Sequence, residues 1–239
     1  MFGSEHAPQH PLFFILALIS VVLTIGYFWG NRLNKKLFLA VHDELIGVIK
    51  PEDQEYGAIG GTGEYYSNFT PPKESPVARV DAKFSFLPRH LWPYLPIAML
   101  IEKYDTLLIA LQFKEKPRLE GHLIETGYAK SRKAKIPFED QLNEVKVTWG
   151  KHNYYIYSKS KKMHARFKEL IHNISEPAVI RHIAFIPGQK KCFIFLVIKK
   201  GQVGKEVELI YQRILSLLSG AGKMEIPPDV PEDDETSPE

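Results

Sequence analysis

Lysine and arginine residues gather in two clusters in the second half of the chain, and cations of this kind bind phosphate groups. The first cluster comprises Lys130, Arg132, Lys133 and Lys135. The second comprises Lys159, Lys161, Lys162, Arg166 and Lys168. Few acidic residues lie between these cations, so the clusters predict contact with anionic lipid headgroups or with RNA, but not with DNA. The alternative is that each cluster is a solvated helix face or loop.

The sequence carries no recognisable catalytic or metal-binding motif. Its nine histidines are dispersed without a His-Glu-x-x-His pattern, and there is no Gly-x-Ser-x-Gly elbow. Cys192 is the single cysteine, which excludes an internal disulfide framework and a cysteine-based zinc site. Because Cys192 begins an apolar run that ends at Ile198, we expect a buried structural thiol. We therefore predict a protein that is not an enzyme and needs no cofactor.

An apolar, proline-bearing stretch from Leu91 to Leu100 is a candidate contact surface. Such a run most often packs in a protein core, and the alternative is a contact with a partner or with the membrane. As a hypothesis, we assign a partner surface to Leu91, Trp92, Tyr94 and Met99.

The N-terminal part of the chain has the composition of a membrane span. Residues 12–30 contain no charged side chain, and about 19 residues at 1.5 Å each nearly cross a hydrocarbon core of about 30 Å. A cleaved signal peptide is the rival interpretation, but it would need a basic start, a shorter apolar stretch and a small-residue cleavage site. We therefore predict a single-pass membrane protein.

The charges that flank the span predict its direction. Residues 1–11 contain no Lys or Arg, whereas cations follow the span directly. The positive-inside rule places the short tail outside and the rest of the chain in the cytosol. The residues assigned to the membrane interface are Tyr27, Trp29, Arg32, Lys35 and Lys36.

The segments that must position the clusters show the periodicities of an α+β domain. Residues 31–50 are expected to form an amphipathic juxtamembrane helix, with an apolar face made of Leu33, Leu37, Ala40, Val41, Leu45 and Val48. The expected strands are 77–87, 106–113, 144–149, 154–158, 179–186 and 191–199. The expected helices are 90–103, 118–128, 161–174 and 203–218. The recurring order predicts antiparallel strand-strand-helix units, with helices on one face, in a cytosolic domain spanning residues 77–222.

Two segments are expected to lack regular structure. Residues 51–76 are rich in Gly and Pro, and the glycines from Gly57 to Gly63 lack the Gly-Lys-Ser/Thr ending of a P-loop, so we interpret them as a flexible loop. Residues 223–239 are acidic and contain several prolines, which predicts a disordered tail.

The order of these features resembles the calumin family, whose eukaryotic members are single-pass subunits of the intramembrane chaperone complex beside the Sec translocon of the endoplasmic reticulum. Residues 31–45, which begin Asn-Arg-Leu-Asn-Lys-Lys, resemble the helix that follows the membrane in that family. Residues 105–119 resemble its strand with a Gln-Phe ending and basic turn, and 145–157 its next hairpin. Residues 192–218 are similar to its final strand and helix.

The departures from the family limit what the resemblance implies. The chain lacks the long acidic luminal region, so calcium binding is not implied. It ends in an acidic, proline-rich segment instead of a lysine-rich helical tail, so any ribosome contact would use the two basic clusters. The compact size suggests a prokaryotic, archaeal relative, which would lie in the plasma membrane, whereas a eukaryotic member would lie in the endoplasmic reticulum.

The resemblance implies a non-enzymatic accessory factor for membrane-protein insertion or folding. Its partners would be the Sec translocon or a YidC-like insertase, with the ribosome and anionic lipids as further contacts. Two alternatives stay open. One is a membrane-anchored enzyme or ligand-binding protein with a pocket at the cytosolic face. The other is a peripheral lipid-binding regulator that uses the same basic clusters.

Overall fold

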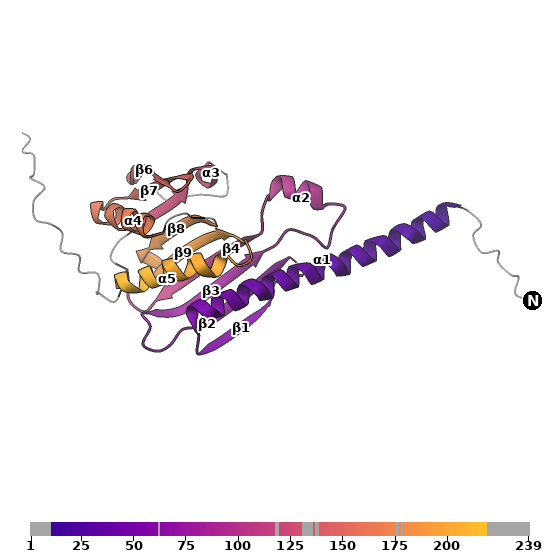
Figure 1. The fold of residues 1–239 in the computed structure, drawn as a ribbon, viewed down its shortest axis with the longest axis horizontal. Coiled ribbons are helices and arrows are strands. Elements are labelled where there is room, and N and C mark those ends of the chain that lie inside the picture. Colours follow the sequence, from indigo (N-terminus) through magenta and orange to yellow (C-terminus); the bar gives the residue numbers. More distant parts are fainter. Residues whose placement is uncertain are drawn as a thin grey trace, which may run out of the picture.

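The computed structural model describes residues 11–61, 63–117, 120–130, 136, 139–174, 177 and 179–218. Within them, nine strands form one antiparallel sheet, and a long helix projects from the domain (Figure 1). The strands are β1 (Asp53–Ala58), β2 (Glu64–Thr70), β3 (Val77–Ser85), β4 (Thr106–Phe113), β5 (Gly121–Glu125), β6 (Asn143–Trp149), β7 (His152–Ser158), β8 (Ile180–Ile186) and β9 (Lys191–Val197). The helices are α1 (Pro11–Ile49), α2 (Leu95–Ile101), α3 (Thr126–Ala129), α4 (Lys161–Asn173) and α5 (Val203–Leu218), with 3-10 turns at Glu139–Gln141 and Pro187–Gln189.

The expected α+β class is confirmed, with the long apolar helix at the N-terminus and antiparallel strands after it. The last two strand-strand-helix units, β6-β7-α4 and β8-β9-α5, also form as expected. They do not make separate sheets, because β5 pairs with both β7 and β8, and β9 pairs with β4. The strand order is β1-β2-β3-β4-β9-β8-β5-β7-β6, so β1 and β6 are the edges.

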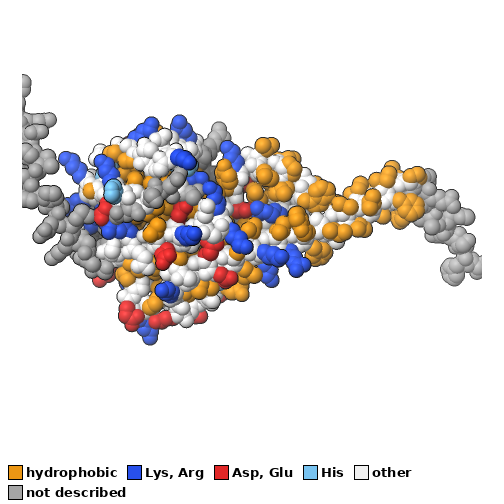
Figure 2. Space-filling model, viewed as in Figure 1, with side chains coloured by type: hydrophobic (Ala, Val, Ile, Leu, Met, Phe, Trp, Pro, Cys, Tyr) orange, Lys and Arg blue, Asp and Glu red, His pale blue; other side chains and the backbone are white. Residues whose placement is uncertain are grey.

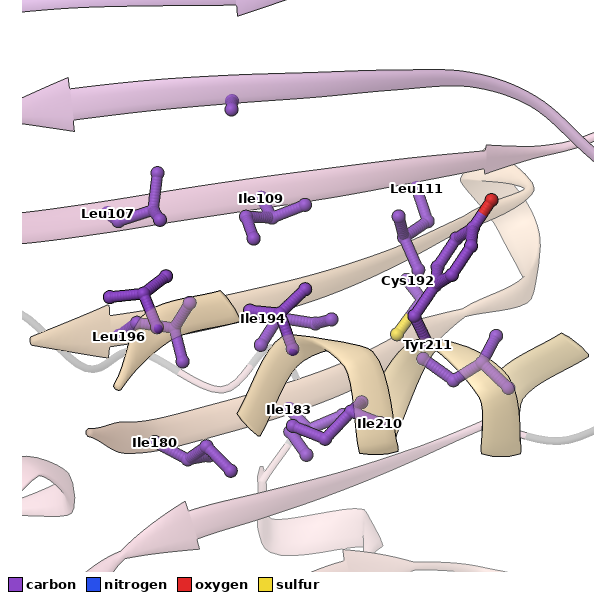
Figure 3. Close-up of a cluster of buried hydrophobic side chains, with 14 of the residues drawn as sticks. Leu107, Ile109, Leu111, Ile180, Ile183, Cys192, Ile194, Leu196, Ile210 and Tyr211 are labelled. Atoms are coloured by element: carbon purple, nitrogen blue, oxygen red, sulfur yellow. The ribbon is translucent and has the colours of Figure 1, made fainter. Parts of the chain in front are cut away.

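One face of the sheet carries the core. Residues that pair across β4, β9 and β8 point to the same face, as in the row formed by Ile109, Ile194 and Ile183. Helix α5 lies over this row and contributes Ile210 and Tyr211 (Figure 3). Helix α4 covers the same face farther along, because Phe167 packs against Phe185. These alternating strands are where sequence periodicity was most informative.

Helix α1 serves both as the projecting rod and as a core element. Its 39 residues measure about 58 Å, about twice a hydrocarbon core. Its C-terminal half lies on β2 and β3, where the Phe38 ring stacks on Tyr65 at 4.6 Å and meets the edge of Phe84 at 5.0 Å. It ends at Ile49, because Lys50 adopts a left-handed backbone with φ of 48° and Pro51 follows.

The buried face of α1 differs from the expected one. Val41, Leu45 and Val48 are buried as expected, but Leu33, Leu37 and Ala40 are only partly buried. Asn34, Phe38 and His42 take the central positions instead. A purely apolar pattern passes over Asn34 and His42, which bond to partners far away in the sequence. Asn34 donates to the Leu87 carbonyl at 3.0 Å, and His42 Nδ1 lies 2.9 Å from the Ser67 hydroxyl, while His42 Nε2 is buried without a partner among the described residues.

The expectation of a loop over residues 51–76 is wrong. Strands β1 and β2 form a hairpin there that pairs with β3, so the sheet begins well before residue 77. The inward alternation of Tyr65, Ser67 and Phe69 specifies β2, and all three are buried. The glycines make the turn, since Gly60 and Gly61 have φ of 61° and 137°.

The expected helix over residues 118–128 is also wrong. Residues 121–125 form β5, and only Thr126–Ala129 are helical. A strand fits because β5 gains two partners, β7 and β8, so tertiary pairing overrides local preference. Gly121 lets α4 approach β5 closely, because a Cβ would lie 2.7 Å from Met163 Cγ and one of the two would have to shift. The expected helix over residues 90–103 is shortened to α2 by Pro93 and Pro96.

Two histidines meet on the face of the sheet opposite the core. His122 Nδ1 lies 3.2 Å from His182 Nε2, on adjacent strands β5 and β8. Burial lowers the pKa of His122 to about 4. Burial, aided by the charge of His122, lowers the pKa of His182 to about 3. Both imidazoles are therefore neutral in the folded protein near pH 7, and one must donate to the other.

We predict that stability falls as pH drops below about 6.5, the usual histidine pKa. The unfolded chain binds these protons more strongly than the folded one, so each histidine should cost about 2 kcal/mol between pH 7 and pH 5, and the pair about 4 kcal/mol. Thermal unfolding of the full chain in detergent measures it. The His182→Gln variant should show a flatter pH profile, whereas His172→Gln, at an exposed position on α4, should keep the wild-type slope. Equal slopes in both variants would contradict the prediction.

Candidate functional site

The N-terminal part of α1 stands free of the domain. Its 18-residue window of highest hydropathy averages 2.4 and has no buried residue, so the helix is long and apolar enough to cross a membrane. Figure 2 shows this part covered by hydrophobic side chains, with cations where it meets the domain. Tyr27 and Trp29 are exposed just before Gly30, the first buried residue. The cations assigned to the interface, Arg32, Lys35 and Lys36, are exposed just after it.

Residues 88–104, which we call the α2 segment, fold back against this part of α1. Trp92 contacts Gly26, where a Cβ would collide with its ring, and the backbone of Arg89 and His90 packs equally closely on Gly30. The Tyr27 and His90 rings meet edge to face at 5.8 Å. Both glycines therefore let a segment of the same chain approach α1 closely.

A partly buried ion pair holds the ends of the α2 segment together. Arg89 binds both carboxylate oxygens of Asp105, at 2.9 and 2.7 Å, and also donates to Asn34 Oδ1 at 2.9 Å. Asn34 in turn donates to the Leu87 carbonyl, and the Leu87 N–H donates to Asp105 at 2.8 Å. We call this network the Arg89 clamp. It joins α1 to both ends of the α2 segment.

The residues assigned to a partner surface lie in the α2 segment and are exposed. Leu91, Trp92, Tyr94 and Met99 each expose between 41% and 51% of their surface. Within α2, all of which the structure describes, Ala98 alone is buried. The default expectation of core packing is therefore wrong for this stretch, because nearly all of its apolar side chains remain exposed, either on the outer surface or toward a cavity.

A cavity of about 1060 Å³ lies between the α2 segment and the face of the sheet opposite the core. Apolar walls come from both sides, including Tyr94 and Ile101 from the α2 segment and Phe195 and Val197 from β9. Polar groups lie along one wall, where Glu125 pairs with Arg181 and with His152, each at 3.3 Å. Its lining ranges from Gly63 to Val197, so sequence motifs could not reveal it.

The two basic clusters are not brought together within the described residues. Lys130 ends α3, which packs on the face opposite the core, since Tyr128 stacks on Phe195 at 4.7 Å. Arg132, Lys133 and Lys135 lie outside the described residues. The second cluster lies on and beside α4, on the core face, at the end of the domain away from the projecting rod (Figure 1).

The α4 cluster forms a cationic surface. Lys159, Lys161, Lys162 and Lys168 are exposed and Arg166 is half-buried, while Met163 and Phe167 anchor the opposite side of the helix in the core. The acidic residue on α4, Glu169, pairs with Arg213 of α5 and does not neutralise this surface. Lys159 donates to Gln141 Oε1 at 3.3 Å, a neutral partner. We call Lys159, Lys161, Lys162, Arg166 and Lys168 the α4 surface.

The groups that could perform covalent or metal chemistry are few. Cys192 is buried, as expected, and burial raises the pKa of its thiol, which keeps it protonated and unreactive. Within the described residues, no group of three or more His, Cys, Asp or Glu side chains could hold a metal ion.

No family model matches the chain, and no curated protein matches it. The resemblance to the calumin family therefore remains a prediction.

We predict that the Arg89→Ala substitution destabilises the domain. It leaves Asp105, whose side chain is 11% exposed, without its cation, which should cost about 3 kcal/mol and lower Tm by roughly 6 to 12 °C. Thermal unfolding of the full chain in detergent, followed by circular dichroism, measures the shift. Arg79→Ala is the matched control, because the Arg79–Asp81 pair is exposed and should contribute less than about 1 kcal/mol. Equal shifts would show that the Arg89 clamp is dispensable.

Proposed function

We propose that the chain is a membrane-anchored, non-enzymatic adaptor that assists membrane-protein insertion or folding beside a Sec translocon or YidC-like insertase. In this proposal α1 spans the membrane, the domain faces the cytosol, and the α4 surface holds the ribosome through its RNA. The observation that carries the proposal is the placement of the apolar rod and the α4 surface at opposite ends of the described structure (Figure 1).

The charges at the junction support this orientation. Arg32, Lys35 and Lys36 are exposed immediately after the apolar part of α1, where the positive-inside rule expects cytosolic cations. The domain would then be on the side of the membrane where ribosomes are found.

The position of α4 favours RNA over lipid as its phosphate source. Helix α1 continues past Gly30 for about 30 Å along the domain, and α4 lies at the end toward which α1 runs (Figure 1). The attraction of anionic headgroups fades over a Debye length of about 8 to 10 Å. Cations on α4 are therefore too far from the protein's own membrane to bind it, and they face a partner on the other side.

Anchoring makes weak contacts sufficient. A tether confines the adaptor to the membrane surface, so its effective concentration at a docked ribosome exceeds its bulk concentration. A handful of exposed lysines that would bind ribosomes only weakly in solution then suffices.

We expect that the combined substitution of Lys161, Lys162 and Lys168 by Glu weakens ribosome binding at least tenfold. It should also lower the salt dependence of binding, by about 2 in the slope of log affinity against log salt. Cosedimentation of ribosomes with the full chain in nanodiscs measures both. The matched control replaces Lys199, Lys200 and Lys205 by Glu, which changes the net charge equally at other exposed positions.

An equal loss in the two variants, or no loss in either, would contradict the proposal. If reversal on α4 instead abolished capture of added anionic vesicles and left ribosome binding intact, the chain would be a lipid-binding regulator.

The cavity favours a second candidate function, that of a membrane-anchored ligand-binding protein. A volume of about 1060 Å³ is at the upper end for small-molecule sites. Apolar walls with a polar group such as Arg181 along one side suit a ligand with an apolar body and a hydrogen-bonding head.

We predict that Ser85→Trp removes a co-purifying ligand if this second function holds, because Ser85 lines the cavity and an indole would fill it. Native mass spectrometry of the full chain, released from mild detergent, detects the ligand. Lys83→Trp is the matched control, because it places the same ring on the same face of β3, two residues away and outside the cavity lining. This variant should retain the ligand. A ligand that persists in the Ser85 variant, or a wild-type chain without one, would exclude the cavity as its site.

A further inference from the structure

The α2 segment lies at membrane depth relative to α1. Its contact with Gly26 is four residues, or about 6 Å, closer to the N-terminus than Gly30, the first residue that the domain buries. A groove of about 540 Å³ beside it is lined by Leu23, Thr24 and Tyr27 of α1 and by Leu91, Pro93 and Tyr94. The α2 segment thus reaches to Leu23, about 10 Å into the apolar part of α1.

The exposed side chains of the α2 segment match the chemistry of a membrane interface. No charged residue occurs from Leu91 to Ile101, and charges resume at both flanks with Arg89 and Glu102. The large hydrophobic side chains that it exposes are Leu91, Trp92, Tyr94, Ile97, Met99, Leu100, Ile101 and Tyr104. A contiguous apolar patch of this kind needs a cover, and aromatic residues are enriched at the headgroup level of bilayers.

The uncharged run from Leu91 to Ile101 is too short to cross a bilayer. Its 11 residues are far fewer than the roughly 20 needed to cross the hydrocarbon core. The helix within it has only seven residues, and it begins just after Pro93 with Pro96 in its first turn. Such an element can only lie in the plane of the interface, with its apolar side chains turned into the lipid.

We propose that the α2 segment is a second membrane-contact element. It is embedded in the interfacial layer of the leaflet that faces the domain, where α1 leaves the bilayer. The occupant of its apolar surface is the bilayer itself, since the surface is continuous with the lipid-facing surface of α1. The Arg89 clamp and the close contact at Gly30 hold the segment in this position. The inference rests on α1 spanning the membrane but is independent of the ribosome contact.

Tryptophan depth measurements test the proposal with the full chain in nanodiscs that contain brominated lipids. The chain has three tryptophans, and Trp149 is a built-in reference, buried in the domain with its indole N–H donated to the Ile174 carbonyl. The Trp29→Phe variant leaves Trp92 and Trp149 as emitters. Bromine near the top of the acyl chains should quench its emission by roughly half, because an interfacial helix sits about 5 to 10 Å deep. A variant that also carries Trp92→Phe should lose this quenching.

Two outcomes would overturn the proposal. The first is equal quenching of these two variants, which would place Trp92 away from lipid. The second is absent quenching together with efficient disulfide crosslinking of a Leu100→Cys variant, which would assign the surface to a second copy of the chain, since Cys192 is buried.

A third variant, with Trp92→Phe and Trp149→Phe, separates this inference from the anchor. Its remaining Trp29 is quenched if α1 spans the bilayer, whatever the α2 segment does. Quenching of Trp29 without quenching of Trp92 would overturn the inference alone, whereas loss of both would overturn the anchor as well.

Discussion

Helix α1 carries two different surfaces along one unbroken backbone, and the rest of the structure depends on how they are arranged. Its first part exposes apolar side chains on all sides, and its second part buries one face under the sheet. No break separates the two, so one continuous helix joins the rod to the domain. At the change from one environment to the other, polar groups such as Asn34 and Arg89 are hydrogen-bonded within the protein, as burial requires.

Contacts with α1 also position the layer of helices that covers the sheet. Glu44 of α1 accepts hydrogen bonds from the Gly201 and Gly204 N–H groups at 2.7 and 2.9 Å, which satisfies donors at the start of α5. Helix α5 is thereby fixed beside α1 over β4, β9 and β8, and α4 follows on the same face. The opposite face stays largely open, and there the α2 segment and α3 enclose a cavity. The sheet thus separates a packed face from one that can receive a ligand.

The sequence was most informative where local pattern and final environment agree. Strand β4 and helix α5 form at the residues expected, because their apolar periods match the single buried face each presents. The β1–β2 hairpin was missed because its turn glycines resemble a linker, although the alternation of Tyr65, Ser67 and Phe69 carried the signal. Strand β5 could not be found locally, since its state depends on two partners distant in sequence. The cavity and the Arg89 clamp are likewise products of tertiary structure alone.

If α1 spans the membrane as proposed, its unbroken course also makes the domain a lever. Membrane helices accommodate bilayer thickness by tilting, by about 20° on average. Because α1 passes without interruption into the core, a change of tilt in the membrane rotates the whole domain. Over the roughly 30 Å of α1 beyond Gly30, a 20° tilt displaces the far end of the domain by about 10 Å. The direction in which α4 points would then report on the thickness of the surrounding bilayer.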